Sequence, residues 1–516
     1  MNDNKISKNS IVAKFAVPIS FLILFFLAAN FTDCDLVTFW KRRNHLTDLV
    51  VDMIPPDFSY IQKILLPLFY TIQMSVTGTV LGIFFALVLS PFGAANLGFP
   101  AVIRRILRIV IQILRSFPAL ILALTATFLF GLGTFAGTFA ITLYTFAIMT
   151  KLTYEDASAA DVKAYQALRA MGVSKYVAYI HGILPEIIPG FLTNALYLLE
   201  TNVRHSSILG YVGAGGIGLL LNEKISWLEY DKVGTILLML FLTVCVIEYF
   251  SRYLAALIRK EHTIKKEQAR LLLLFLAALF LICTFTLSLP DFSRTSPQTL
   301  RNMFAGFLQP DWSFFFSAEK DGLGYLLLET VCIAFIGTVI GAIVSAPLAF
   351  LNTKRFVPAP VSFLFNLVIM IIRSVPFLVY GLIFIRVSGP GAFTGVLTLA
   401  VCSIGLLTKR FTEALDALDP RPYHALLAMG VRPLPAICHS VLPQLKPVFT
   451  SIILYRFDVN IREASVLSLV GAGGIGAPLI FSMNQYAWEK AGAIMLGLIL
   501  FVWFIDMVSE KIGAGN

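Results

Sequence analysis

The sequence predicts an all-α polytopic membrane protein with about twelve transmembrane helices, arranged as two six-helix, pseudo-symmetric repeats. The first observation is composition: 58% of the 516 residues are hydrophobic and 14% are charged, whereas soluble domains carry about 25% charged residues. The mean hydropathy is correspondingly high, at +0.82. The second observation is an internal repeat, and the third is the spacing of long apolar segments. Together they argue against a soluble globular domain.

The internal repeat joins the two halves of the chain. Residues 150–218 recur as residues 408–476 at a constant offset, with 31 identities in 69 gap-free positions. The identities run through the polar part of the stretch as well as the apolar part, so shared hydrophobicity does not explain them. We interpret the repeat as a tandem duplication. We therefore expect two domains, a first half at 1–260 and a second half at 261–516.

The apolar segments match this division, because each half offers six that approach the roughly 20 residues needed to cross a bilayer. In the first half they are 11–30, 64–90, 108–130, 134–150, 187–210 and 233–257. In the second half they are 271–289, 325–350, 361–385, 391–407, 445–468 and 489–509. The run at 15–29 could be a signal peptide. Its counterpart at 271–289 cannot be cleaved as one, so we expect a retained helix.

Basic residues predict the orientation. Most lysines and arginines lie in alternate connections, which places both termini and the polar segments 151–186 and 409–444 in the cytoplasm. The cluster Lys41-Arg42-Arg43 falls on the other side and is the main discordant feature. The net charge of +10 follows from this distribution and needs no nucleic acid partner.

The two polar segments share a pattern of their own. Each contains Ala-Met-Gly-Val, at 170–173 and 428–431, and reaches Leu-Pro thirteen residues after the Gly. A Gly at this place ends a short helix, a second short helix follows, and the proline begins the next element. We read each segment as a compact helix–turn–helix. An interfacial amphipathic helix is the plainer alternative, but two equivalent copies at one spacing argue against it.

This pattern resembles the coupling loop of ABC importer permeases, which docks into a groove on a cytoplasmic ATPase subunit. The resemblance implies that the ATPase contacts are made by Gln166, Ala167, Gly172, Pro185, His424, Ala425, Gly430 and Pro443. The family usually places Glu six residues before the Gly, where this chain has Gln166 and His424. A specific charge contact is therefore expected to be missing or altered.

The stretch after each loop is similar to the phosphonate-type branch of that family. It reads Asn202-Val203-Arg204 and then Gly213-Ala-Gly-Gly-Ile-Gly218, and the second half repeats it from Asn460. The resemblance covers roughly 64–257 and 325–509. It implies the permease subunit of an importer for phosphonate or a related oxyanion in the bacterial inner membrane. It also implies two ATPase subunits that hold ATP and Mg, and an extracytoplasmic substrate-binding protein.

Arg204 and Arg462 are the candidate substrate contacts. Arginine inside an apolar span is costly, so it suggests function, and guanidinium suits a phosphorus oxyanion through its planar fork of donors. Neutral donors nearby complete the expected pathway: Asn202, Asn460, Ser207 and Ser465. The alternative is that the arginines snorkel to the interface or pair with Glu200 and Asp458.

Glycine and proline mark two further expectations. Gly213, Gly216, Gly471 and Gly474 are expected to form a sharp turn or gate. The stretch also spells the dinucleotide fingerprint G-x-G-x-x-G, but that motif needs a soluble βαβ unit, whereas here it follows a predicted transmembrane helix and occurs twice. The pairs Arg115 and Pro118, and Arg373 and Pro376, are expected to form a hinge at the inner mouth. Arginines that cap a kinked helix at the interface are the equal alternative.

No catalytic constellation is found in the sequence. There is no P-loop, no metal-ligand spacing and no CxxC pair, so we expect neither an enzyme nor a bound cofactor. One alternative is an ion-coupled secondary transporter of an anionic solute, which would need buried carboxylates. The candidates are Glu200, Glu248, Asp458, Glu463 and Asp506. The other is a membrane enzyme that acts on phosphorylated lipids. Neither explains the loop pattern.

Overall fold

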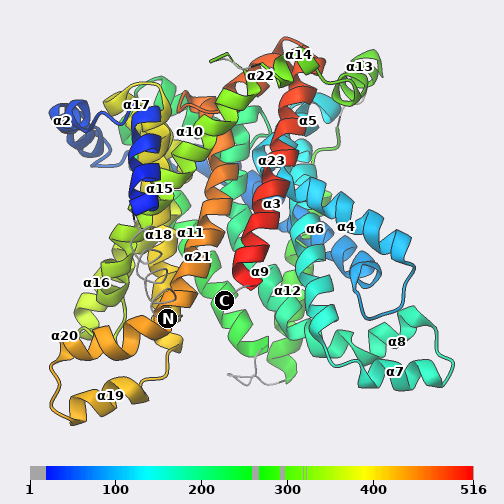
Figure 1. The fold of residues 1–516 in the computed structure, drawn as a ribbon. Coiled ribbons are helices and arrows are strands. Elements are labelled where there is room, and N and C mark those ends of the chain that lie inside the picture. The colour runs from blue at the N-terminus through cyan, green and yellow to red at the C-terminus, as the bar shows by residue number, and fades with distance from the viewer. Residues whose placement is uncertain (1–18, 259–265, 291–296, 318, 321, 515–516) are drawn as a thin grey trace, which may run out of the picture. The chain divides into compact units, whose positions relative to one another are not determined.

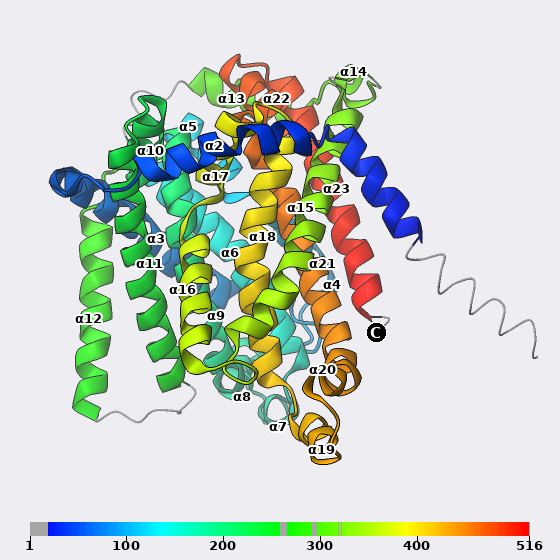
Figure 2. The ribbon, with the colours of Figure 1, turned by 90° about the vertical axis from the view of Figure 1, so that its left-hand side faces the viewer.

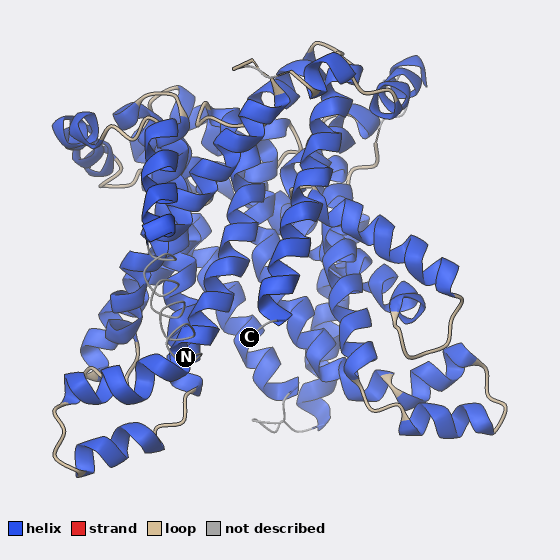
Figure 3. Ribbon diagram, viewed as in Figure 1, coloured by secondary structure: helices blue, strands red, loops and turns tan. Residues whose placement is uncertain are grey.

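The computed structural model describes residues 19–258, 266–290, 297–317, 319–320 and 322–514. Every regular element within these ranges is a helix (Figure 3), which confirms the predicted all-α class. The expected boundary between the domains, at 260 and 261, and the start of the first expected span lie outside the described residues.

The chain forms two compact units, and they do not coincide with the sequence repeats. One unit is residues 49–304, which we call the first unit. The other combines 1–48 with 305–516, which we call the second unit. Helices α2 (Leu36–Asp52) and α13 (Pro297–Leu308) contain the points of division. Each unit therefore includes a segment that belongs to the other repeat.

The first unit is built around α3, which packs along α6 and α9 (Figure 1). Its remaining helices surround these three or cap their ends. In chain order the elements are η1 (Phe58–Tyr60), α3 (Ile61–Gly93), α4 (Ala101–Ser116), α5 (Ala119–Phe130), α6 (Thr134–Ala159), α7 (Lys163–Ala170), α8 (Lys175–Gly182), α9 (Leu184–Leu209), η2 (Gly210–Val212), α10 (Ile217–Ser226), α11 (Tyr230–Ile258) and α12 (Lys266–Phe285).

The second unit repeats this plan around α15, α18 and α21. The helix Ile19–Phe31 opens it. Its other elements are α14 (Trp312–Phe315), α15 (Leu323–Asn352), α16 (Ala359–Ser374), α17 (Phe377–Ser388), α18 (Ala392–Ala417), α19 (Arg421–Ala428), α20 (Pro433–Ala436), the π-helix η4 (Ile437–Val441), α21 (Leu442–Leu467), η5 (Ser468–Val470), α22 (Gly476–Asn484) and α23 (Trp488–Ala514).

The central helix pair of each unit packs through glycine. In α3, Gly78 and Gly82 lie one turn apart, and a Cβ added to Gly82 would stand 2.6 Å from the Cβ of Thr145 in α6. In α15, a Cβ on Gly341 would stand 2.4 Å from the Cβ of Ser403 in α18. Small residues four apart allow two membrane helices to approach closely. This approach brings the polar side chains of three helices within hydrogen-bonding distance.

The segments exchanged between repeats are the first apolar helices. Ile19–Phe31 lies beside α15 in the second unit, where Phe21 packs on Phe335 with ring centroids 5.5 Å apart (Figure 1). Conversely, α12 lies beside α3 in the first unit (Figure 2). There, Gln73 Nε2 donates to Cys283 O at 3.1 Å and to Thr286 Oγ1 at 2.8 Å. Each core is thus completed by a helix of the other repeat.

Seven helices of the described residues are long and apolar enough to cross a membrane, or up to ten if each of three bent pairs is one span. Two shorter apolar helices, Ile19–Phe31 and Leu276–Phe285, stand at the remaining predicted places. The expected spans 108–130 and 361–385 are each divided into two helices at the predicted proline kink. Helices α4 and α5 meet at 95°, and α16 and α17 meet at 87°.

The proline after each break explains why the two helices of each pair meet at a sharp angle. Phe117 precedes Pro118 with φ −89° and ψ 128°, and Val375 precedes Pro376 with φ −77° and ψ 124°. These are extended conformations, because proline disfavours helical geometry in the residue before it. The 12 residues of α5 reach about 18 Å at 1.5 Å per residue. That is shorter than the hydrocarbon core of about 30 Å.

Candidate functional site

A glycine-rich turn follows α9 and recurs after α21. Gly213, Gly215 and Gly216 have φ between +77° and +81°, and the three matching glycines have φ between +74° and +89°. Glycine adopts this left-handed region without the steric cost that a Cβ imposes. The last glycine serves packing instead. A Cβ on Gly218 would lie 2.2 Å from Ser207 O, and one on Gly476 would lie 1.9 Å from Ser465 O. The predicted sharp turn is therefore present in both units.

Hydrogen bonds tie each turn to the helices around it. Gly133 N donates to Gly213 O at 3.0 Å, and Ile217 N donates to Thr71 Oγ1 at 2.8 Å. The equivalent contacts in the second unit are 2.8 Å from Gly391 N to Gly471 O and 3.2 Å from Ile475 N to Thr330 Oγ1. The turn thus joins the end of α9 or α21 to the starts of the neighbouring long helices.

The second turn has two side-chain tethers that the first lacks. Glu329 Oε2 accepts from Gly474 N at 2.9 Å, and Ser468 Oγ accepts from Gly476 N at 3.1 Å while donating to Gly473 O. Tyr70 and Gly210 stand at the corresponding places in the first unit. The second turn is therefore the more firmly held of the two.

The two candidate arginines are paired within their own helices. Arg204 forms an ion pair with Glu200 one turn earlier, and Arg462 forms one with Asp458. The arginine side chains are 15% and 18% exposed. Of the two interpretations weighed from the sequence, pairing with the acidic neighbour is the one that the structure displays. Contact with an anion remains a hypothesis.

The predicted serine donors also bond locally. Ser207 Oγ donates to Arg204 O at 2.6 Å, and Ser465 Oγ donates to Arg462 O at 2.7 Å. Both serines are buried. Such bonds to the preceding turn are common for hydroxyl side chains in helices, and here they leave the serine protons committed to the backbone.

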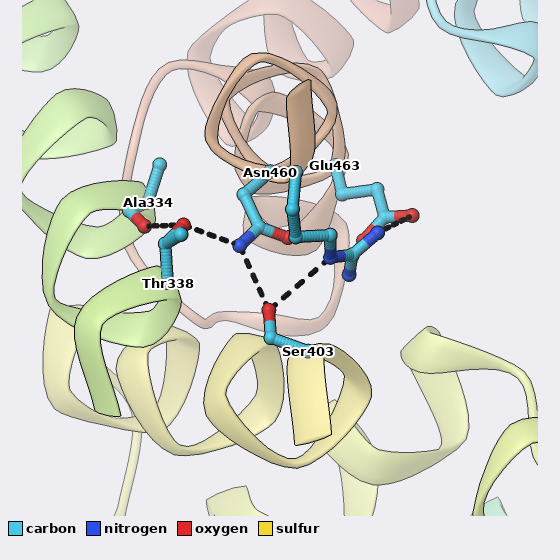
Figure 4. Close-up of polar contacts among 6 residues, drawn as sticks. Ala334, Thr338, Ser403, Asn460 and Glu463 are labelled. Atoms are coloured by element: carbon cyan, nitrogen blue, oxygen red, sulfur yellow. Dashed lines mark hydrogen bonds and ion pairs between the residues drawn. The ribbon is translucent and has the colours of Figure 1, made fainter. Parts of the chain in front are cut away.

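Asn202 and Asn460 act as clamps between three helices. Asn202 Nδ2 donates to Thr79 Oγ1 in α3 and to Thr145 Oγ1 in α6, both at 2.8 Å. Asn460 Nδ2 donates to Thr338 Oγ1 at 2.6 Å and to Ser403 Oγ at 2.9 Å (Figure 4). Both asparagines are fully buried. An amide nitrogen has two protons, so neither clamp retains a donor for a solute.

A buried ion pair in α21 was missed by the sequence interpretation. Arg456 Nη2 lies 2.8 Å from Glu463 Oε2, and Arg456 Nε donates to Ser403 Oγ at 3.2 Å (Figure 4). The arginine and glutamate side chains are 5% and 18% exposed. Their counterparts in α9 are Leu198 and His205. The sequence interpretation considered Glu463 but not Arg456, which the rarity of arginine in an apolar span could have revealed.

The predicted hinge residues stand at the breaks between bent helices. Arg115 and Arg373 occupy the last turns of α4 and α16, while Pro118 and Pro376 directly precede α5 and α17. The predicted kink is therefore present in both units. The role of the kink as a hinge remains a prediction.

The two helix–turn–helix loops are present, at the end of each unit opposite to α10 or α22 (Figure 1). Gly172 and Gly430 follow the first short helix with φ +83° and +82°. The methionines before them, Met171 and Met429, are 70% and 77% exposed. The other residues expected to contact a partner are also exposed: Gln166, Ala167, Pro185, His424, Ala425 and Pro443. Each loop thus presents several accessible side chains.

Both units also carry an exposed tip after α10 or α22, which the sequence interpretation did not anticipate. Leu228 and Tyr486 lie at equivalent places with φ +62° and +59°, a conformation that is unusual for bulky residues. They are 55% and 61% exposed. Glu229 directly follows the first tip residue, Leu228. The hydrogen bonds that it accepts from Lys232 and, with a smaller effect, from Lys224 lower its pKa. Strained, exposed residues of this kind are often functional.

Comparison with known proteins connects these features. The protein family described as "Binding-protein-dependent transport system inner membrane component" matches this chain over residues 78–260 and again over residues 337–512. The chain belongs to this family. The two matches begin at Gly78 and Gly337, so each includes the glycine packing, the loop, the asparagine clamp and the turn of one repeat.

Several curated relatives of the family are similar to this chain. A phosphate-import permease of Mycolicibacterium smegmatis is 27% identical over 90% of this chain and 88% of its own length. A phosphite transport system permease of Stutzerimonas stutzeri is 35% identical over 36% of this chain and 67% of its own. A putative cryptic phosphonate transport system permease of Escherichia coli is 36% identical over 23% of this chain and 96% of its own.

Two family matches in one chain identify this multi-pass membrane protein as a permease with both halves fused. The matches leave out residues 1–77 and 261–336. These intervals contain the two exchanged helices, Ile19–Phe31 and α12. Among solved structures, a chain of the inward-facing MetNI methionine transporter aligns with 39% of this chain and 99% of its own, at 21% identity and a TM-score of 0.36.

Proposed function

We propose that this permease imports phosphonate or a related phosphorus oxyanion, driven by ATP hydrolysis on separate subunits. The observation that carries the proposal is the repeated unit of exposed loop, long helix and glycine turn in a chain of this family. Relatives are described as phosphate-import, phosphite and phosphonate permeases, which supports the substrate class. The permease supplies the pathway and does not itself hydrolyse ATP.

The exposed loops are the proposed docking surfaces for two cytoplasmic ATPase subunits. Met171 and Met429 would enter the groove of the partner, since exposed methionine adapts to a binding surface. ATP and Mg would be bound by those subunits. This arrangement places the loops and both chain termini in the cytoplasm of a bacterium, with the protein in its inner membrane.

The tips at Leu228 and Tyr486 are the proposed contacts for an extracytoplasmic substrate-binding protein. The family description names such dependence on a binding protein. Both tips lie at the turn end of their unit, opposite to the loops (Figure 1). A partner that releases an oxyanion there would deliver it beside the glycine turns.

Helices α9 and α21 would transmit movement between the two ends. Each has 26 residues and therefore spans about 39 Å at 1.5 Å per residue. Closure of the ATPase subunits would move the loops, and the helices would carry that movement to the clamps and turns. The kinks at Pro118 and Pro376 would act as the hinge that lets the short helices α5 and α17 follow.

For the substrate contact we favour Arg204 and Arg462 over the asparagines and serines, whose donors are already used. Arg204 Nε is buried and makes no hydrogen bond with any residue of the described ranges. A doubly charged oxyanion would also compete with the single charge of Glu200 for the guanidinium. The ion pairs would then hold the arginines in place until substrate arrives.

Uptake of radiolabelled methylphosphonate, phosphite and phosphate into proteoliposomes tests the function. The liposomes would contain this permease with its ATPase and binding protein, energised either by ATP or by an ion gradient. We expect uptake of one of these anions to require ATP and both partners. The double variant Arg204→Ala with Arg462→Ala should lower it by at least tenfold.

The matched control is Arg252→Ala, which removes another arginine paired with a glutamate one turn earlier. It should fold and retain uptake. Uptake driven by the gradient alone would refute the ATP-driven function and favour the secondary-transporter alternative. ATP-dependent uptake that survives the double variant would refute the arginine contact while leaving the function intact.

A further inference from the structure

Helix α4 in the first unit has an exposed apolar stripe that no described residue covers. Its side chains are 39% to 69% exposed and recur every three or four positions: Val102, Ile103, Ile106, Ile109, Val110 and Ile113. The helix meets α5 at 95°, so it does not continue the direction of the following helix. An amphipathic helix of this kind is suited to the interface between headgroups and acyl chains.

Basic residues cluster at the start of the same helix. Arg108 donates through Nε and Nη2 to Gly93 O, at 3.0 and 2.9 Å, and Arg104 Nη1 lies 3.5 Å from Ala95 O. Lys175 Nζ donates to Gly98 O. Arg105 is exposed.

The charge of this cluster is not neutralised within the chain. Arg104, Arg108 and Lys175 contact backbone carbonyls, and Arg108 and Lys175 also lie over the rings of Tyr154 and Phe99. None of the four cations forms an ion pair with a carboxylate in the part of the chain that the structure describes. Four cations without a carboxylate partner create a site of positive potential beside an apolar stripe. Anionic headgroups attached to acyl chains match both features.

The second unit shows that the fold does not require this cluster. Helix α16 occupies the equivalent place and also exposes apolar residues, among them Phe363 at 71% and Leu364 at 59%. At the positions of Arg104, Arg105 and Arg108 it has Ser362, Phe363 and Asn366. The shared feature is therefore the apolar stripe. The three arginines within the helix are found in α4 and not in α16, while the second unit has Lys354 and Arg355 in the connection before α16.

We propose that α4 lies in the membrane interface and that Arg104, Arg105, Arg108 and Lys175 bind the headgroup of an anionic phospholipid. The inference goes beyond the transport function, and only the assignment of this site to the cytoplasmic leaflet rests on that function. The bound lipid would brace the connection at 93–100, which also supports the first loop. Tyr165 Oη donates to Leu97 O at 2.6 Å there, and Asn96 Nδ2 donates to Ala157 O at 2.9 Å.

Native mass spectrometry of the full-length chain tests lipid binding without any need for transport. The protein in zwitterionic detergent would be titrated with phosphatidylglycerol or phosphatidylcholine. We expect saturable binding of phosphatidylglycerol, weakened about fivefold for each arginine removed. The triple variant Arg104→Gln, Arg105→Gln, Arg108→Gln should therefore bind about a hundredfold more weakly.

The control triple variant is Lys41→Gln, Arg42→Gln, Arg43→Gln in α2, which removes the same charge from another exposed basic cluster. This control variant should bind phosphatidylglycerol as tightly as the wild-type protein. Equal weakening in both triple variants would overturn the proposal, as would equal binding of the two lipids. Displacement of the lipid by 10 mM inorganic phosphate would also overturn it, since the site would then belong to a free anion.

Hydrogen exchange gives a second measurement if the arginine variant folds poorly. In wild-type protein, amides of α4 should exchange more slowly in phosphatidylglycerol nanodiscs than in phosphatidylcholine nanodiscs. Amides of α16 should show no such difference. An equal response of the two helices would contradict a specific lipid site at α4.

Discussion

Helices α9 and α21 occupy the same place in the two repeats, yet they differ in buried charge. Both carry the asparagine clamp, an arginine paired one turn earlier and a glycine turn. Only α21 adds the buried pair of Arg456 and Glu463, and only its turn is held by Glu329. The clamp, the paired arginine and the glycine turn position each helix, and both repeats have all three. The added charges are not needed for that purpose and mark where the second half has specialised.

The loops differ in packing rather than in charge. A Cβ on Gly182 would stand 2.8 Å from Tyr165 N, so the two short helices of the first loop are in close contact. Ser440 replaces that glycine, and the chain there forms the π-helix Ile437–Val441. Helix α19 consequently has no buried residue, whereas α7 buries Tyr165. The second loop is thus less tightly supported than the first.

The largest effect is expected from Arg456→Leu, which installs the residue found in α9. It leaves Glu463 buried without its partner and should lower the free energy of unfolding in detergent by about 3–5 kcal/mol. The double variant Arg456→Leu with Glu463→His carries the residues of the first half at both positions. Its free energy of unfolding should fall less than that of the single variant. Arg410→Leu breaks an exposed pair with Glu413 and should cost about 0–1 kcal/mol. A single variant no worse than the double one would show that the pair does not matter.

A smaller effect is expected from removing the clamps. Asn202→Ala loses two interhelical hydrogen bonds and should lower the free energy of unfolding by about 1 kcal/mol, since such bonds in membranes average about 0.6 kcal/mol each. Asn460→Ala should cost more, because its partner Ser403 also accepts from Arg456. Equal values for the two clamps would argue against a connected network.

The control for the clamps is Asn194→Ala on α9. Asn194 is partly buried and makes no recorded side-chain hydrogen bond with a described residue. Its removal should change the unfolding free energy by less than about 0.5 kcal/mol. A loss as large as that of Asn202→Ala would indicate a general effect of removing asparagine from this helix.

The smallest effect is expected at the glycine turn. Glu329→Gln exchanges a charge-assisted hydrogen bond for a neutral one of roughly half its strength. The amide of Gly474 should then exchange its hydrogen a few times faster, as measured by mass spectrometry, while Gly216 in the other unit is unchanged. Tyr70→Phe, at the equivalent place in α3, should alter neither amide. Equal acceleration of both glycines would mean that the two turns are not held differently.

Much of the fold could be predicted because its signals are local. The glycine turns and the loops depend on residues close together in the chain, and the repeat shows each of these local patterns twice. The kink at Pro118 was predicted, but its angle of 95° was not, because proline alone does not decide between a mild kink and a sharp turn. The clamp partners of Asn202 lie 57 and 123 residues away, so only tertiary structure reveals them.

The exchanged first helices impose an order on biosynthesis. The first unit is made from one continuous segment, so the ribosome completes it without interruption. The helix Ile19–Phe31 must instead wait for α15, because Phe335 is made about 300 residues after its partner Phe21. At 5–20 residues per second, this delay lasts about 15–60 s. During that time the helix Ile19–Phe31, the first in the described part of the chain, lacks its native neighbour, so this is the period in which a membrane insertion factor would protect it.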